Sequence, residues 1–525
     1  MITTLLWRLR HWWHQVGRPQ RLALLVGALV TLARLSLIGK GTMAFVDESR
    51  YVNAMLGLRS LSEGHGQEFL RYINSMGARP GDGIWRAIPG LGQALLLLVF
   101  DLNPNAPPSL QVPQAFNVLI VSLNALLLYH IYRRFFSVGT ALLGLALYSC
   151  LVNTNFYLRH LLPYDHSLFF FFLALVLLLR PKAAVSLRLQ ALTGVLGGLS
   201  YAIYPGYFMG PLLLLALALP AGFGAVRTDW LRSLKPGAVQ LAGLLAVLLA
   251  FEGLAQLGQT SYWASSRYIA TTVTQGSFAE GFSFIGSYFW QVEGWLGSGL
   301  LVLFGVGLGL SWQTGLSANA SVAERELVRL LTAVFLVWLG YALVVQVGHK
   351  LVFYGRTLHF FVPFIIMGAL VALRAVGRLA QPRAWLYLGG GGIALGHFGM
   401  FLAVYLPVDY PCDIAYHTGI YDYQQIATSQ VSVCDEHLMA YRLFGPRLRH
   451  QLAQKPNSAR FQLLNFAYLY PVSCYRPAHL APGKVVADVP YFMKYPAYQF
   501  EGHSASQRAI LQNHAVDFQI VIEHN

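Results

Sequence analysis

The stretch of sequence that decides the fold class is RHLLPYDHSLFFFFLALVLLL, residues 159–179. From Leu168 to Leu179 every residue is apolar, and a polar segment that contains Arg159 and Asp165 stands directly before this run. An apolar run of this kind belongs either to a helix that crosses a membrane or to a helix buried in a protein core. The composition of the whole chain decides between the two.

The chain as a whole is too apolar for a soluble protein. Of its 525 residues, 56% are hydrophobic and 11% are charged, and its mean hydropathy is +0.50. Soluble globular proteins carry roughly 25% charged residues, so this is an integral membrane protein. Disordered, fibrous and coiled-coil proteins are excluded, because each needs polar or periodic sequence. The formal charge of +15 then indicates membrane topology rather than a nucleic acid partner.

The apolar runs predict an all-α polytopic membrane protein. A spanning helix needs roughly 20 mostly apolar residues, and the sequence contains about eleven such stretches. They lie near 22–38, 114–132, 139–157, 164–179, 189–204, 206–222, 237–257, 294–311, 329–347, 358–376 and 385–405.

The basic residues predict how these spans are oriented. The apolar stretch 87–102 is only about 16 residues long, and we predict that it is an interfacial helix. With that choice the basic clusters fall on one side, which the positive-inside rule makes cytoplasmic together with the N-terminus. The clusters include Arg133-Arg134, Arg180, Arg188, Arg227 and Arg374. The basic N-terminus and first apolar run indicate a signal anchor, since residues 34–40 offer no small-residue cleavage site.

Three large pieces then lie outside the cytoplasm. They are a first loop at 39–113, with its interfacial helix, a second loop at 258–293 and the tail at 406–525. We therefore divide the chain into a membrane domain, 1–405, and a soluble extracytoplasmic domain of mixed α/β character, 406–525. On that oxidising side a disulfide is possible among Cys412, Cys434 and Cys474, with Cys412–Cys434 closing the shorter loop. Three buried thiols are the alternative.

The most informative polar string is FVDESRY, residues 45–51, just after the first span. Two adjacent carboxylates at a membrane surface repel each other and are costly to bury. If the segment is helical, Asp47 lies on the same face as Arg50 and Tyr51. Arg50 would then hold Asp47 ionised, as a general base requires. The alternative is structural, because Asp and Glu also favour the first turn of a helix.

An acidic pair at this place, followed closely by Arg and Tyr, resembles the GT-C glycosyltransferases. The resemblance is strongest to the branch of the protein O-mannosyltransferases and the lipid A aminoarabinose transferase. It implies a sugar donor linked to polyprenyl phosphate, used on the outer face of the cytoplasmic membrane. It also implies that Asp47 is the catalytic base and Glu48 its neighbour, with Arg50 and Tyr51 on the substrate side.

Two more segments carry the resemblance. The family has a short helix with a proline motif in the first loop, and RAIPGLG, residues 86–92, begins such a segment. The usual double proline and following basic residue are absent. The sequence therefore leaves two candidates for the phosphate contact, Arg86 and Arg79. The family also has an Arg followed by an Asp that opens a helix. Arg159 and Asp165 match this pattern, which implies a phosphate contact and an organising carboxylate; an interfacial salt bridge is the alternative.

A late outer segment supplies further cations. In GHKLVFYGR, residues 348–356, the resemblance implies that Lys350, Tyr354 and Arg356 contact the carrier phosphate, ahead of a helix that contains Pro363. Arginine offers bidentate contact to phosphate. Arg267 in the second outer loop is a further candidate. Contact with lipid headgroups is the alternative for each of these cations.

The sequence thus predicts an inverting glycosyltransferase. It does not decide whether the acceptor is a lipid, a glycan or a protein. His160, His166, His349 and His359 gather near the outer boundaries, but no His spacing supports a metal site. The closest branch of the family implies no metal, although a divalent ion is not excluded.

A transporter or flippase is the alternative function, since transporters also carry Arg and Asp near substrate paths. Transporters more often show paired repeats with broken helices, which the sequence lacks.

Overall fold

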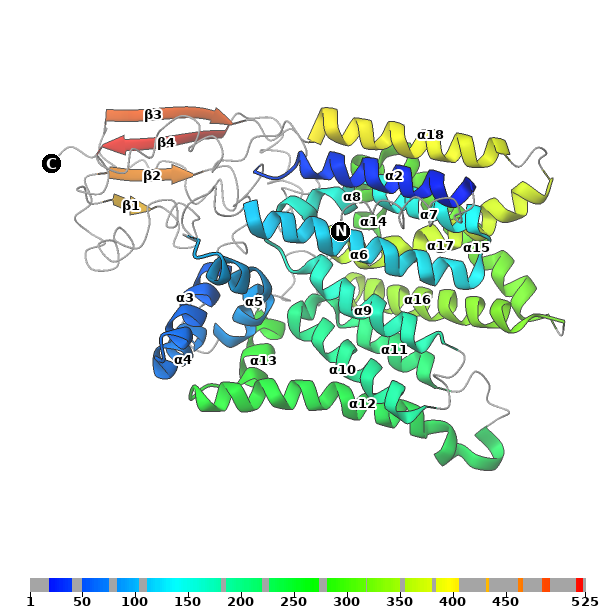
Figure 1. The fold of residues 1–525 in the computed structure, drawn as a ribbon, viewed down its shortest axis with the longest axis horizontal. Coiled ribbons are helices and arrows are strands. Elements are labelled where there is room, and N and C mark those ends of the chain that lie inside the picture. The colour runs from blue at the N-terminus through cyan, green and yellow to red at the C-terminus, as the bar shows by residue number, and fades with distance from the viewer. Residues whose placement is uncertain are drawn as a thin grey trace, which may run out of the picture.

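The structure is a computed structural model of the chain. It describes residues 18–39, 50–74, 83–102, 111–180, 186–219, 226–272, 281–317, 319–349, 355–379 and 384–405, with four strands between 431 and 522. Most of the described chain is a bundle of roughly parallel helices (Figure 1).

Each predicted span corresponds to helix in this bundle. In chain order the bundle contains α2 (Arg18–Leu35), α6 (Gln111–Phe135), α7 (Val138–Cys150), α8 (Val152–Phe156), α9 (Tyr164–Leu178), α10 (Leu187–Ile203), α11 (Met209–Ala218), α12 (Val226–Leu257), α14 (Gly281–Val292), α15 (Gly294–Gly315), α16 (Val322–Gln346), α17 (Gly355–Leu379) and α18 (Ala384–Met400). Among the described residues, six helices are long and apolar enough to cross a membrane, and α17 is the most buried of them. The prediction of an all-α polytopic membrane protein is confirmed.

Two predicted spans are less regular than the apolar runs indicate. The run 139–157 is broken at Leu151 into α7 and α8, and a 3-10 turn at Tyr157–Arg159 follows. The run 206–222 begins with a 3-10 turn at Pro205–Tyr207 and leaves a helix, α11, that ends at Ala218. The last helix of the bundle, α18, is followed by a π-helical turn at Phe401–Tyr405.

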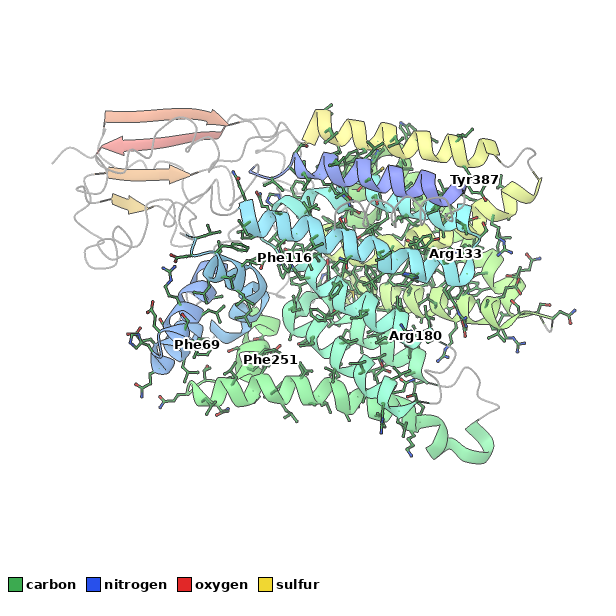
Figure 2. All side chains as sticks on the ribbon, in the orientation of Figure 1. Phe69, Phe116, Arg133, Arg180, Phe251 and Tyr387 are labelled. Carbon is green, nitrogen blue, oxygen red and sulfur yellow. The ribbon has the colours of Figure 1, made fainter. Side chains whose placement is uncertain are left out.

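A second group of helices covers one end of the bundle. It consists of α3 (Arg50–Ser62), α4 (Gly66–Asn74), α5 (Gly83–Val99) and α13 (Tyr262–Thr272), and we call this end the α5 end (Figure 1). These helices share a small apolar core with the neighbouring ends of α10 and α12, in which Ala54, Leu97 and Tyr262 are buried. Phe69 and Phe251, labelled in Figure 2, pack against it. Most of the stretch 87–102 therefore lies in α5, outside the main bundle, and its interfacial position stays a prediction.

The opposite end of the bundle is basic. Helix α6 runs between the two ends, with Phe116 near the α5 end and Arg133 at the other (Figure 2). Arg180, which follows α9, lies at the same end as Arg133 (Figure 2). We call this the basic end. It carries several of the residues from which the cytoplasmic side was predicted.

Glycines allow two pairs of helices to approach at backbone distance. A Cβ added at Gly307 of α15 would lie 1.8 Å from the carbonyl oxygen of Gly368 in α17. A Cβ added at Gly194 of α10 would lie 1.9 Å from the carbonyl oxygen of Gln240 in α12. Small residues at helix contacts are typical of membrane bundles, because close packing replaces the hydrophobic effect there.

After the bundle the structure describes one small sheet. Its strands are β1 (Val431–Val433), β2 (Phe461–Asn465), β3 (Lys484–Tyr491) and β4 (Val516–Ile522), in the order β1-β2-β4-β3. β1 and β2 are parallel, and β4 pairs antiparallel with both β2 and β3. The strands supply the β part of the mixed α/β region that was predicted. The three cysteines of the tail lie outside the described residues, so their pairing stays a prediction.

The glycine contact predicts a position-specific loss of stability. Gly307→Ala must push α15 away from the backbone of α17, which costs about 1–3 kcal/mol. Gly309→Ala is the matched control, because a Cβ at Gly309 meets nothing within 4 Å. We expect a lower thermal unfolding temperature for Gly307→Ala in detergent and an unchanged or slightly higher one for Gly309→Ala. Equal melting temperatures for the two variants would contradict the close contact.

Candidate functional site

The candidate site is built around the break between α7 and α8. Leu151 adopts an extended conformation, with φ −67° and ψ 145°, and ends one helix just before the next begins. A break inside a membrane bundle frees backbone N–H and C=O groups that must be satisfied within the protein. Side chains from three directions provide these partners.

The freed carbonyls are held by two side chains. The amide nitrogen of Asn155 donates to the carbonyls of Ser149, at 2.9 Å, and Leu151, at 2.7 Å. The guanidinium of Arg34 in α2 donates to Ser149 at 3.0 Å and to the side-chain oxygen of Asn155 at 2.9 Å. Arg34 is buried, and its position at the end of α7 places its charge where the helix dipole favours a cation.

The freed N–H groups are held by Glu293, which precedes α15. Its two carboxylate oxygens accept from the backbone nitrogens of Val152, at 3.0 Å, and Asn153, at 2.7 Å. His397 of α18 lies 2.6 Å from the same carboxylate. Both carboxylate oxygens already accept backbone N–H bonds, and Nε2 of His397 is placed to donate to one of them. Both side chains are buried.

Asn153 connects the break to Asp165. Its amide nitrogen donates to the carbonyl of Gly355 at 3.1 Å and to the hydroxyl of Tyr288. Its oxygen therefore accepts from Nδ1 of His359, at 2.5 Å. The other ring nitrogen of His359 lies 3.1 Å from the Asp165 carboxylate. The imidazole of His359 therefore joins Asn153 to Asp165.

The same contact joins the first turns of α9 and α17. One turn before His359, the guanidinium of Arg356 donates to the hydroxyl of Tyr164 at 2.9 Å, and Tyr207 donates to the Arg356 carbonyl at 2.8 Å. On the other side Asn124 of α6 donates to the backbone carbonyl of Asp165 at 2.9 Å. Tyr164 also packs against neighbouring tyrosines; it contacts the rings of Tyr157 at 5.1 Å and Tyr204 at 4.7 Å between centroids.

Two of the predicted site residues are thus brought together. Asp165 opens α9 and Arg356 opens α17, and the contacts through Tyr164 and His359 hold both in one cluster. Asp165 is 4% exposed, whereas Arg356 is half-buried. Arg267 lies elsewhere: it is an exposed residue of α13, in the accessory group. Asp165 is thus buried inside the cluster, and Arg356 lies at its partly exposed edge.

The remaining candidates fall wholly or partly outside the described residues. Asp47, Glu48, Lys350 and Tyr354 lie outside them. Arg50 and Tyr51 begin α3, Arg86 is in the first turn of α5 and Arg159 ends the 3-10 turn after α8, but their side chains lie outside the description.

Several residues of the network were not predicted. His359 was counted among the outer histidines, but its partner Asp165 was not foreseen, and Asn153, Glu293 and His397 were not singled out. A signal for Asn153 existed, since Asn153-Thr154-Asn155 interrupts an apolar run. Within the described part of the chain, no group of three or more His, Cys, Asp or Glu residues is arranged to hold a metal ion.

Comparison with known proteins identifies the fold. No protein-family model matches the sequence, and no curated protein matches it. The crystal structure of ArnT from Cupriavidus metallidurans bound to undecaprenyl phosphate does match, with a TM-score of 0.53 and 13% identity over 83% of this chain and 88% of that chain. ArnT is a GT-C lipid A aminoarabinose transferase. The chain has the GT-C fold. The fold implied by the sequence resemblance is therefore confirmed.

The network around the helix break predicts a large effect of Glu293. Glu293→Ala leaves His397 without its partner and two backbone N–H groups unsatisfied, and it should destabilise the protein by about 3–5 kcal/mol. Glu293→Gln keeps an oxygen acceptor, so its loss should be smaller. Glu63→Ala, at an exposed glutamate, is the control and should leave the melting temperature unchanged. An unfolding temperature of Glu293→Ala equal to that of the control would refute this account of the break.

Proposed function

We infer that this chain is a membrane glycosyltransferase that transfers a sugar from a polyprenyl-phosphate donor to a hydroxyl group of an acceptor. The observation that carries the proposal is the fold shared with ArnT, whose crystal structure contains undecaprenyl phosphate. The proposal also explains why buried polar groups, which are costly in a membrane protein, gather around the start of α9 and α17.

The proposed donor site uses the cations near these two helix starts. Arg356 is half-buried and lies over the ring of Tyr164, with Cζ 6.0 Å from its centroid. Lys350 precedes Arg356 by six residues, and Arg159 precedes Asp165 by six, so both belong to segments that lead into the cluster. A guanidinium at this place suits a phosphate, since it presents several N–H donors in one plane. Arg86 and Tyr354 are further candidates for the carrier phosphate.

In the proposed reaction Asp47 is the base, with Glu48 beside it and Arg50 and Tyr51 close behind at the start of α3. Asp47 takes the proton of the acceptor hydroxyl. The resulting oxygen nucleophile attacks the anomeric carbon from the face opposite the phosphate. The bond between that carbon and the phosphate oxygen breaks, and its electron pair stays on the phosphate. One such displacement inverts the configuration at the anomeric carbon.

The negative charge that develops on the leaving phosphate is stabilised by Arg356, Lys350 and Arg159. Asp165 acts through its neighbours. Because it is buried against His359, one turn after Arg356, it fixes the start of α17 and thereby the direction of the Arg356 side chain. Asp165 is therefore a positioning residue in this mechanism. Arg267 is a weaker candidate, since it is exposed on α13.

The proposal includes a location. The chain is a multi-pass membrane protein, and we assign it to the cytoplasmic membrane with the N-terminus and the basic end in the cytoplasm. The α5 end, with the candidate site, then faces outward. On the same assignment residues 1–405 form the catalytic membrane domain, and residues 406–525 form an extracytoplasmic domain that caps the site or selects the acceptor.

The first test is Asp47→Asn. Without the base, glycosyl transfer should fall by about two to four orders of magnitude, measured as accumulation of one polyprenyl-phosphate sugar in membrane lipid extracts by mass spectrometry. Glu63→Gln is the control and should transfer normally. Normal transfer by Asp47→Asn would remove Asp47 as the base. If deleting the protein changes no glycan and no carrier pool, the enzyme itself is refuted, and transport becomes the better hypothesis.

The second test separates contact from positioning. Arg356→Ala should lower kcat by about 10²–10³-fold if its guanidinium stabilises the leaving phosphate, and Arg356→Lys should recover part of the loss. The control is Arg59→Gln, at a half-buried arginine that pairs with the exposed Asp101, and it should behave as the unaltered protein. A pure rise in KM for Arg356→Ala, with kcat unchanged, would mean that Arg356 only binds the donor.

A further inference from the structure

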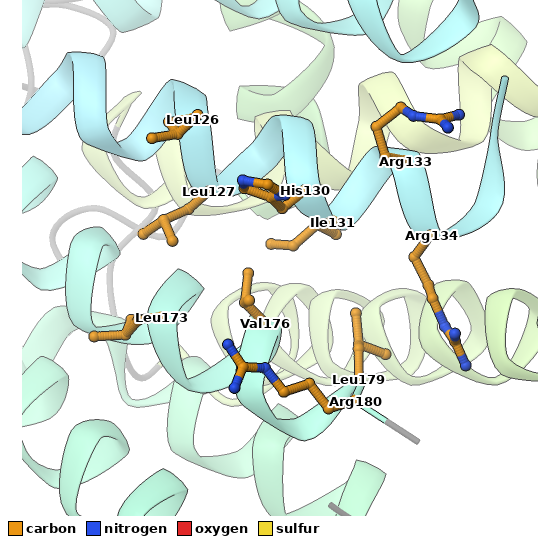
Figure 3. A pocket seen from close by; sticks show the side chains of 10 residues that line it. All are labelled: Leu126, Leu127, His130, Ile131, Arg133, Arg134, Leu173, Val176, Leu179 and Arg180. Carbon is orange, nitrogen blue, oxygen red and sulfur yellow. The ribbon is translucent and has the colours of Figure 1, made fainter. Parts of the chain in front are cut away.

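The basic end of the bundle contains a cavity that the proposed reaction does not use. It lies between the last turns of α6 and α9 and has a volume of about 560 Å³ (Figure 3). Leu127 of α6 and Leu173 and Val176 of α9 contribute apolar walls. Basic side chains, His130 and Arg180 among them, line the part nearer the ends of the two helices. The lining therefore combines apolar walls with basic side chains.

The cations at this cavity differ in whether they have partners. Arg134 forms a bidentate ion pair with Glu326 of α16, at 2.9 to 3.1 Å, and its charge is compensated. Arg133 donates to the carbonyl of Phe136 at 2.5 Å, in the region where the end of α6 favours a cation. For the guanidinium of Arg180, no carboxylate lies within ion-pair distance among the described residues. It is exposed, and Figure 3 shows it turned back along α9 beneath Val176, on the side of the cavity.

We propose that this cavity is a binding site for one anionic glycerophospholipid, with the headgroup phosphate at Arg180 and an acyl chain against Leu127, Leu173 and Val176. A phospholipid carries the same two kinds of group, an apolar acyl chain and a charged phosphate. Basic pockets between membrane helices are suited to such headgroups, because each cation near the surface adds to the attraction.

The charges select an anionic lipid over a zwitterionic one. A zwitterionic headgroup carries an ammonium group in addition to its phosphate. The nearby carboxylate, Glu326, is already engaged by Arg134, so the ammonium group would meet only cations among the described side chains of this cavity. An anionic headgroup meets no such penalty. The site is distinct from the proposed donor site, which lies at the other end of α9, and the inference does not rest on the proposed function.

The position of the cavity gives the lipid a structural consequence. Helices α6 and α9, which form its walls, are also joined at the candidate site, where Asn124 of α6 donates to the backbone carbonyl of Asp165. A lipid wedged between their other ends completes the packing of the pair along its length. Binding to the folded protein alone stabilises it in proportion to the logarithm of ligand excess, so the anionic lipid should raise the unfolding temperature.

The test uses the full-length protein, purified in a neutral detergent or placed in phosphatidylcholine nanodiscs with and without phosphatidylglycerol. Native mass spectrometry should detect one phosphatidylglycerol retained per chain, and this lipid should raise the melting temperature. Arg180→Gln should weaken retention by about fivefold, the loss of one cation. Val176→Phe keeps every charge but places a larger side chain where the acyl chain would lie, and it should also weaken retention.

The control is Arg188→Gln, at an exposed arginine of the same end that does not line the cavity; it should retain the lipid normally. Equal weakening by Arg180→Gln and Arg188→Gln would show general surface attraction and overturn the site. Equal retention of phosphatidylcholine would remove the selection by charge. Full protection by inorganic phosphate would make the ligand a free anion, and preferential retention of polyprenyl phosphate would make it the carrier; either result overturns the proposed occupant.

Discussion

The constraint on which the rest of the structure depends is the break of a helix inside the bundle, at Leu151. In water the freed backbone groups would bind solvent, but within a membrane bundle each unsatisfied group costs free energy. The protein satisfies them with side chains from distant helices: Arg34 reaches the carbonyl side of the break, and Glu293 reaches the N–H side. Three parts of the chain far apart in sequence are therefore fixed to one point.

A chain of side-chain contacts connects this break to the candidate site. His397 contacts Glu293, Glu293 caps the start of α8, and Asn153 in that first turn contacts His359. His359 in turn contacts Asp165, so the first turns of α9 and α17 cannot shift independently of the break. Burial of the side chains decreases from the break toward the edge of this network. The groups that hold the backbone are buried, and Arg356, at the edge of the network, is half-buried.

The sequence predicted the parts of this arrangement that depend on one segment at a time. Apolar runs predicted the spans, the short run 87–102 predicted a helix outside the bundle, and the placement of Asp165 and Arg356 marked both as candidates. The break at Leu151 was not predicted, because the residues from 139 to 152 are almost uniformly apolar and nothing in them requires an extended residue. The partners of the break were not predictable either. Glu293 and His397 are single polar residues in apolar surroundings, and their pairing depends on how α15 and α18 pack.

The contact between Asp165 and His359 has a consequence for the order in which the bundle assembles. The two residues lie 194 positions apart in the sequence. The first turn of α9 therefore cannot gain this partner until α17 has been synthesised and has packed beside it, so the cluster around Asp165 is completed only late in assembly.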